Sequence, residues 1–280
     1  MRVKRLLALA AVGVTALGGA TSTHVSLSYA VNAVKVVGPG EISSNWSGYA
    51  LTSADPTAPT AFTDVTGTWT QPKVTCSAGR RDAVAFWVGL GGDDPSSQAL
   101  EQLGTAADCN GVSTKPVYSV WWEIIPAASV PVRMRVSPND RITAALVVAG
   151  TRVTMSLKDV TRGTRFSKTV SVSQVDTTSA EWIVEAPSSC NAVGMCRVVP
   201  LTRFGTVTFS DAATIGDTVP DTLASATWAL SPITLITGSG DGFFGNQETS
   251  GAGTGAVPSD ITPDGRGFTV SWQPNVTPGR

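Results

Sequence analysis

The sequence is divided into short β-forming segments by frequent turn signals, and this pattern restricts the fold more than any other feature. Segments rich in Val, Ile, Thr, Trp and Phe alternate with clusters of Gly, Pro, Asn, Asp and Ser. Turn signals include Pro138-Asn139-Asp140, Ala149-Gly150 and Pro263-Asp264-Gly265. Few segments show a helical period, and no β-α-β alternation is present. The pattern predicts an all-β protein, an antiparallel two-sheet β-sandwich of jelly-roll or concanavalin-like type.

The predicted strands run through the whole chain after the first forty residues, with no internal repeat. They are Trp46–Leu51, Asp64–Thr70, Ala83–Leu90, Gln98–Gly104, Tyr118–Ile125, Arg141–Val148, Arg152–Asp159, Ser167–Val172, Ala180–Glu185, Val207–Ser210, Ile233–Ile236 and Gly267–Trp272. A Gly- and Ser-rich stretch, Gly238–Gly255, is predicted to be a long surface loop before the last strand.

The N-terminus has the features of a secretory signal peptide. A basic start, Met1–Arg5, is followed by the short apolar run Leu6–Val14 and then by small residues. Cleavage is expected after Ala20 or Ala33, so residues 1–33 form the signal peptide with or without a short pro-segment. Residues 34–280 then form a single β-sandwich domain. No other stretch is long and apolar enough to span a bilayer, so we expect a secreted, extracellular protein.

Charge and histidine content exclude several functions. The net charge is −1 and no basic run follows the leader, so nucleic acid and membrane surfaces are not expected partners. The one histidine, His24, lies in the leader or just beyond it. If the leader ends near Ala33, the mature chain has no imidazole. Ser-His-Asp triads, Cys-His pairs and His-ligated metals are then excluded, and no metal or cofactor is expected.

Four cysteines, Cys76, Cys109, Cys190 and Cys196, suggest two disulfides in an exported chain. Three pairings are possible. Pairing of Cys190 with Cys196 would close a small loop, and Cys76–Cys109 would then close a longer one. A zinc site is the weaker alternative, because the spacings do not fit and no histidine assists.

The segment Ala180–Glu185 places two carboxylates in an apolar strand. Because alternate side chains of a strand share a face, Glu181, Ile183 and Glu185 point to one side, and the Trp and Val residues between them point to the core. Taken alone, the face with two glutamates fits an ordinary solvent-exposed surface.

Two further strands carry polar residues in the same way. In Tyr118–Ile125, Ser119, Trp121 and Glu123 share the face opposite the predicted core side. In Gln98–Gly104, a face is formed by Gln98, Leu100 and Gln102. If these faces adjoin, they form a concave polar strip with aromatic walls, which suits an extended polymer. Trp46, Trp87 and Trp121 are candidates for the groove. The core is expected to hold Trp69, Trp122, Trp182, Trp228 and Trp272.

Seven segments occur in an order that resembles a known family. They are Ser44–Gly48 (SNWSG), Val65–Trp69 (VTGTW), Phe86–Asp93 (FWVGLGGD), Glu101–Gly104 (EQLG), Trp121–Pro126 (WWEIIP), Ala180–Glu185 (AEWIVE) and Phe204–Phe209 (FGTVTF). Together they are similar to segments of the glutamic peptidases, or eqolisins. The match runs from about Ile42 to Asp211.

The resemblance implies a two-sheet sandwich with endopeptidase activity at acidic pH. We expect a polypeptide substrate, no cofactor and a monomeric protein. By motif position, Gln102 and Glu185 are the catalytic pair. Glu123 matches an acid near the site, and Trp87 matches a tryptophan of the substrate groove. Cys190 matches the family's second disulfide.

The chemistry of these residue types agrees with such roles. A carboxylate can take a proton from water and pass it to the leaving nitrogen. A glutamine N–H can donate to the developing oxyanion. Because glutamate has a reference pKa of about 4.3, catalysis of this kind can persist in acid, where imidazole would be protonated.

The sequence also differs from the family pattern. Fungal members carry acids at the positions of Ala106 and Ser119, and Gly91 replaces another acid while Asp93 is kept. The first disulfide must differ too. Relatives of bacterial type share some of these changes. With fewer acids around the site, the pKa of the catalytic carboxyl and the working pH are expected to change.

Two other functions fit the same residues. A jelly-roll glycoside hydrolase would use Glu123 and Glu185 as paired carboxylates. A non-catalytic carbohydrate-binding module would use the groove tryptophans alone. Gln102 distinguishes these interpretations, because a peptidase needs it as an oxyanion donor and a glycosidase does not.

Overall fold

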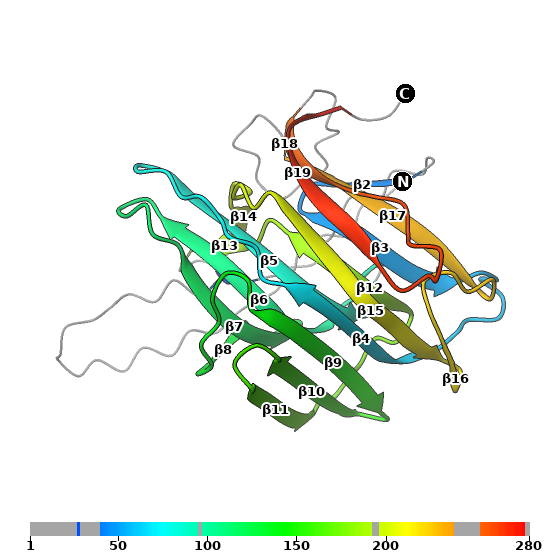
Figure 1. The fold of residues 1–280 in the computed structure, drawn as a ribbon. Coiled ribbons are helices and arrows are strands. Elements are labelled where there is room, and N and C mark those ends of the chain that lie inside the picture. The colour runs from blue at the N-terminus through cyan, green and yellow to red at the C-terminus, as the bar shows by residue number, and fades with distance from the viewer. Residues whose placement is uncertain (1–26, 29–39, 95–96, 192–195, 238–252, 278–280) are drawn as a thin grey trace.

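The computed structural model describes residues 27–28, 40–94, 97–191, 196–237 and 253–277, and within these ranges every regular element is a β-strand. Figure 1 shows strands stacked in two layers, which are joined at one end by the pairing of β17 with β18. The long sheet is antiparallel apart from one short parallel pair, β2 with β17. The structure confirms the predicted all-β sandwich.

One layer carries the segments with polar residues. Its strands, in spatial order, are β17 (Trp228–Ile236), β3 (Trp46–Ser53), β12 (Ser179–Glu185), β5 (Arg81–Leu90), β6 (Glu101–Asn110), β7 (Val117–Ile124) and β8 (Val130–Val132), with β2 (Glu41–Ser43) beside β17. The strands of the facing layer are β11 (Thr164–Ser171), β10 (Arg152–Asp159), β9 (Arg141–Ala149), β4 (Phe62–Thr70), β15 (Thr206–Gly216), β19 (Phe268–Val276) and β18 (Gly253–Pro258), with β16 (Val219–Asp221) beside β15.

The main hydrophobic core fills the space between the layers. Trp69 and Trp182 are fully buried in it, and Trp228 lies at its edge with 5% exposure. Two other tryptophans expected in the core, Trp122 and Trp272, pack against its margin and stay partly exposed. The apolar side chains that alternate along each strand are therefore buried mainly by packing of one layer on the other.

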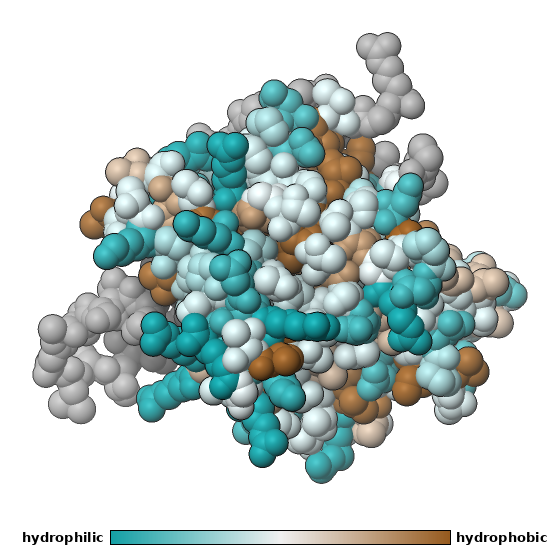
Figure 2. Space-filling model, in the orientation of Figure 1, coloured by the Kyte–Doolittle hydropathy of each residue, from teal (hydrophilic) through white to brown (hydrophobic). Residues whose placement is uncertain are grey.

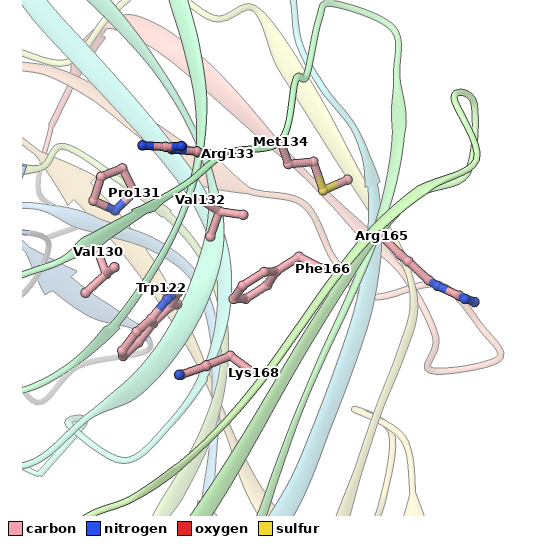
Figure 3. Close-up of a pocket in the computed structure, with 9 residues that line it drawn as sticks. All are labelled: Trp122, Val130, Pro131, Val132, Arg133, Met134, Arg165, Phe166 and Lys168. Atoms are coloured by element: carbon pink, nitrogen blue, oxygen red, sulfur yellow. The ribbon is translucent and has the colours of Figure 1, made fainter.

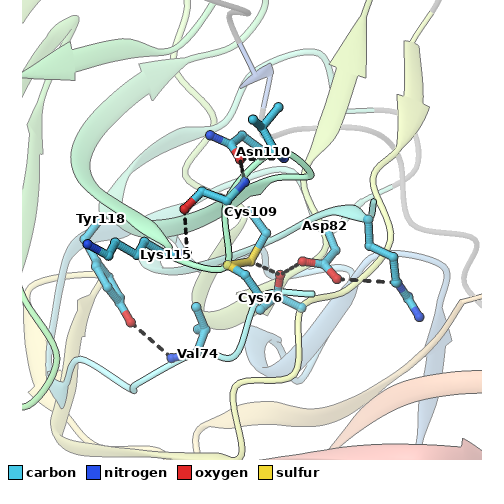
Figure 4. The surroundings of a disulfide bond; sticks show 11 residues. Val74, Cys76, Asp82, Cys109, Asn110, Lys115 and Tyr118 are labelled. Atoms are coloured by element: carbon cyan, nitrogen blue, oxygen red, sulfur yellow. Dashed lines mark hydrogen bonds and ion pairs between the residues drawn. A yellow bond between two sulfur atoms is a disulfide. The ribbon is translucent and has the colours of Figure 1, made fainter. Parts of the chain in front are cut away.

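Two disulfides, Cys76–Cys109 and Cys190–Cys196, are present, which confirms the favoured pairing. The second joins β13 (Ser188–Cys190) to β14 (Cys196–Val198) in a small separate sheet that also includes β1 (Leu27–Ser28). Around the first, the hydroxyl of Thr202 donates a 2.7 Å hydrogen bond to Asp82 (Figure 4). This disulfide ties the loop after β4 to the end of β6.

The predicted strands are all found; Arg152–Asp159 has the predicted bounds, and the others have shifted ends. The largest shift concerns Gln98–Gly104, because the strand begins at Glu101 and continues to Asn110. Short strands such as β8, β16 and the β13–β14 pair were not predicted, since three residues are too few to show alternation. The predicted surface loop Gly238–Gly255 is wrong at its end, where Gly253–Gly255 begin β18. Residues 238–252 lie outside the described part.

The predicted signal peptide falls almost entirely outside the described residues, so its cleavage point and the domain boundary stay predictions. Among the described residues, no helix is long and apolar enough to cross a membrane.

Candidate active site

Four adjacent strands, β12, β5, β6 and β7, bring the candidate catalytic side chains to one face of their layer. Backbone pairing sets Gln102 beside Glu123 and sets Glu185 beside Trp46. The apolar neighbours Leu103 and Val184 point to the opposite side, into the core between the layers. Gln102 and Glu185 therefore share the face that points away from this core, as the alternation predicted.

The carboxylate of Glu185 is held by two donors. The indole N–H of Trp87 donates to Oε2 over 2.9 Å, and the amide of Asn45 donates to Oε1 over 3.3 Å. None of the Glu185 surface is exposed. Its cross-strand neighbour on β5 is Ala85, which is also fully buried.

Burial raises the pKa of Glu185 well above its ordinary value, and the nearby carboxylate of Glu123 raises it further. The hydrogen bond from Trp87 opposes this increase, as does that from Asn45. The indole N–H of Trp46 also lowers the pKa, although it forms no hydrogen bond within the usual distance and angle limits. The net direction is upward, so the protonated form persists to higher pH than in an exposed glutamate.

Gln102 and Glu123 are directly bonded. Nε2 of Gln102 donates to Oε2 of Glu123 over 2.9 Å, and both side chains are fully buried. A carboxamide nitrogen carries two N–H groups, and this contact uses one of them. The hydrogen bond orients the amide of Gln102 on the site face. Glu123 also raises the pKa of Glu185 electrostatically, so it interacts with both candidate catalytic residues.

Trp87 spans the distance between the two ends of the site. On β5, Gly89 is the neighbour of Gln102, and Ala85 is the neighbour of Glu185. Trp87 lies between these small residues and its ring passes over Gly89, where an added Cβ would come within 2.9 Å of the ring. Glycine at position 89 therefore makes room for the tryptophan that holds Glu185.

The three predicted groove tryptophans meet in a second apolar cluster on the site face. The rings of Trp46 and Trp87 pack edge to face with their centres 5.1 Å apart, and Trp121 belongs to the same cluster. Each ring is nearly or fully buried. In this structure the tryptophans line the site as tightly packed walls and not as exposed platforms.

A second group of acids, around Glu101 and Glu181, lies at the end of these strands that is farther from Glu185 and near Gln102. Both glutamates are fully buried. Burial raises the pKa of Glu101 to about 8, and both of its oxygens accept the backbone N–H of Asp176 over 3.4 Å. Burial also raises the pKa of Glu181, and Asp93, Asp176 and Glu101 add to the increase. The two glutamates of Ala180–Glu185 thus have different acidic neighbours: this second group raises the pKa of Glu181, whereas Glu123, the hydrogen-bond partner of Gln102, raises the pKa of Glu185.

Two polar residues of this face were not predicted. Asn45, which bonds Glu185, stands inside the SNWSG segment, but the type of residue alone does not reveal its partner. Asp108 lies on the same side of β6 as Gln102 and Ala106, and burial raises its pKa to about 6. It supplies an acid two residues beyond the alanine that replaces the fungal one. Alternation along β6 could have indicated it.

No group of three or more His, Cys, Asp or Glu residues within the described ranges is arranged to hold a metal ion. The acids of the site are instead bonded to amide, indole and backbone donors.

Residues 44–237 match the model of the Peptidase A4 family. The chain belongs to this family. Members are the glutamic peptidases, so this A4 peptidase is a hydrolase that acts on peptide bonds as an endopeptidase. The match covers every predicted site residue. Membership supports the peptidase interpretation over the glycoside hydrolase and the carbohydrate-binding module.

Three solved structures of similar fold are described as peptidases. Scytalido-glutamic peptidase, crystallised with a transition-state analogue inhibitor, is 23% identical, with a TM-score of 0.63, covering 82% of this chain and 98% of its own. SCP-B, described as an eqolisin in complex with the tripeptide Ala-Ile-His, is 24% identical with a TM-score of 0.58 over the same shares. Aspergilloglutamic peptidase from Aspergillus niger is 20% identical, with a TM-score of 0.50, covering 69% of this A4 peptidase and 99% of its own chain. No curated protein matches significantly.

Proposed function

We propose that this A4 peptidase cleaves polypeptides with Glu185 as general base and acid and Gln102 as oxyanion donor. The Glu185 carboxylate takes a proton from water, and the resulting hydroxide attacks the carbonyl carbon. The carbonyl oxygen becomes an oxyanion. Glu185 then passes its proton to the leaving nitrogen as the C–N bond breaks, and a carboxylic acid and an amine are released.

Gln102 stabilises the oxyanion through its amide N–H. Such a donor contributes about 10²–10³ in kcat when it is preorganised. The hydrogen bond to Glu123 provides that preorganisation, because it holds the amide in one orientation within a buried site. Glu123 is therefore a positioning residue, and Trp87 has the same role for Glu185.

The position of Glu123 is the observation that carries the proposal. It accepts a hydrogen bond from Gln102 and raises the pKa of Glu185, which joins residues from β6 and β12 into one group. All three side chains are fully buried. A peptide bond therefore reaches them only after the groups that cover them move aside.

The raised pKa of Glu185 sets the pH range that we propose. A general base must be ionised, so activity falls as pH decreases through this pKa. The fall occurs above the ordinary pKa range of glutamate, so the acidic limb of activity lies at higher pH than it would for an exposed glutamate. We propose export as well, since two disulfides persist in an oxidising compartment.

The test is cleavage of denatured casein by the wild type and by two variants, with pepstatin present. Glu185→Gln keeps the size of the side chain but removes the base, and we expect a loss of at least 10³ in kcat. Gln102→Ala should lose about 10²–10³.

The matched control is Glu181→Gln, which makes the same change on the same face of the same strand. It should retain wild-type kcat. Full activity of Glu185→Gln, or equal losses in the two glutamate variants, would refute the assignment. Hydrolysis of β-glucan with no cleavage of casein would instead support the glycoside hydrolase.

A further inference from the structure

A cleft of about 410 Å³ opens on the outside of the molecule, between β7–β8 and β11. These strands come from different layers, and β8 and β11 are the two ends of the long sheet. Each has a strand partner on one side only among the described residues. The cleft is therefore bordered by two unpaired strand edges.

The centre of the cleft is apolar. Figure 3 shows Trp122, Val132 and Phe166 directed toward one another, with Met134 above them. Trp122 and Phe166 are partly exposed, which leaves aromatic surface for a ligand. Trp122 stands between Trp121 and Glu123 on β7, so the cleft lies on the reverse side of a strand that carries the candidate active site.

The border of the cleft is basic. It contains Arg133, Arg165 and Lys168, and the Lys168 side chain runs below Trp122 in Figure 3, whereas Arg165 points outward. All three are exposed, and none forms an ion pair with a carboxylate of the described chain. No acidic residue lines the cleft.

The charge around the cleft differs from that of the whole protein. Residues 130–175 carry eight Arg and Lys against two Asp, although the net charge of the chain is −1. Those two, Asp140 and Asp159, are both bonded to Arg162. Figure 2 shows hydrophilic side chains over the lower part of the molecule, where β9, β10 and β11 lie, with small hydrophobic areas between them.

We propose that this cleft is a docking site for an extended acidic polypeptide segment. The unpaired edge of β11 can add a strand, the apolar centre can take one side chain, and the cations can pair with acidic residues on either side of it. The cleft is open, and an open cleft suits an extended segment that runs through it. A small molecule would be bound better by a closed cavity that surrounds it.

Another explanation assigns the cations a purely protective role. Charged side chains on an edge strand prevent pairing with a second sheet edge. Protection alone requires no preference for acidic partners and no contribution from Phe166. Docking requires both, so binding measurements distinguish the two. Docking is also independent of the roles of Glu185 and Gln102.

The test is fluorescence anisotropy with the labelled peptide Glu-Val-Glu-Phe-Glu-Val-Glu, at low salt. The full chain carries Glu185→Gln, so that the probe is not cleaved. We expect at least tenfold tighter binding than for the same peptide with lysines in place of glutamates. Lys168→Glu should weaken the binding roughly three- to tenfold, because an exposed ion pair becomes a repulsion. Phe166→Ala should weaken it for this peptide, and much less for one with glycines in place of Val and Phe.

The matched control is Arg152→Glu, the same kind of charge reversal at an exposed cation on β10 outside the cleft. It should change the affinity less than twofold. Equal losses from Arg152→Glu and Lys168→Glu would overturn the proposal, because they would indicate diffuse attraction. It would also be overturned by equal affinity for acidic and basic peptides. Duplex DNA bound as tightly as the peptide, with no effect of Phe166→Ala, would indicate a general polyanion surface and would contradict it as well.

Discussion

The indole N–H of Trp87 donates a 2.9 Å hydrogen bond to Oε2 of Glu185, and neither side chain has exposed surface. The two residues lie on neighbouring strands, β5 and β12. A buried carboxylate without donors would be strongly destabilised, so this contact helps to maintain the ionised form. The protonation of Glu185 is therefore governed by a small number of identified neighbours, each of which can be changed.

Replacing Trp87 by Phe removes the N–H and keeps most of the ring. Because the hydrogen bond lowers the pKa of Glu185, its loss should raise that pKa and move the acidic limb of kcat/KM to higher pH. We expect a decrease of about tenfold in kcat/KM at weakly acidic pH, since a hydrogen bond to a charged group contributes about 1.5–3 kcal/mol. Trp182→Phe makes the same change at a residue that bonds the backbone oxygen of Thr66, and it should leave the limb in place.

Replacing Glu123 by Gln should move the acidic limb in the opposite direction. The Glu123 carboxylate raises the pKa of Glu185, so a neutral amide in its place lowers that pKa, and the base remains ionised in stronger acid. The maximal kcat should fall too, because Gln102 loses its charged acceptor. The measurement is a complete pH profile. A limb that stays in place or moves to higher pH would show that Glu123 does not act on Glu185 as described.

Glu101 should make the folded protein less stable as pH rises. Its pKa is about 8 in the folded state and 4.5 when unperturbed, so the unfolded chain loses this proton first. The contribution is fully present below about pH 4.5 and is lost as pH rises toward 8, by up to ~1.4 kcal/mol for each pH unit. Glu101→Gln should therefore show a smaller decrease of Tm between pH 5 and pH 8 than the wild type. Parallel Tm curves would show that Glu101 ionises normally.

The two disulfides should differ in their effect on stability. Cys76 and Cys109 are 33 residues apart in the sequence, whereas Cys190 and Cys196 are 6 apart. Loop-closure entropy then predicts losses of about 4 kcal/mol and about 2 kcal/mol when each pair is replaced by serines. Urea unfolding measures both. A larger loss from the shorter loop would mean that contacts around β13 and β14, and not chain entropy, determine the difference.

Local sequence patterns were sufficient to predict much of the fold and to predict on which face of its strand each site residue lies. Alternation on Ala180–Glu185 and Tyr118–Ile125 put Glu185 and Glu123 opposite the core, and backbone pairing agrees. Family motifs then selected Gln102. Short strands such as β8 could not be predicted, because pairing with a neighbour, and not the residues themselves, makes them strands.

The sequence by itself determined which side chains share a face of each strand, since that follows from the two-residue period of extended backbone. It also determined that no imidazole is at hand for catalysis if the leader ends near Ala33. Only the tertiary structure decided that Glu185 meets Trp87 and Asn45, that Glu101 raises the pKa of Glu181, and that Trp122 faces Phe166 in the cleft between β7–β8 and β11. These contacts depend on the register between strands that are distant in sequence, and that register is set by packing of the whole sandwich.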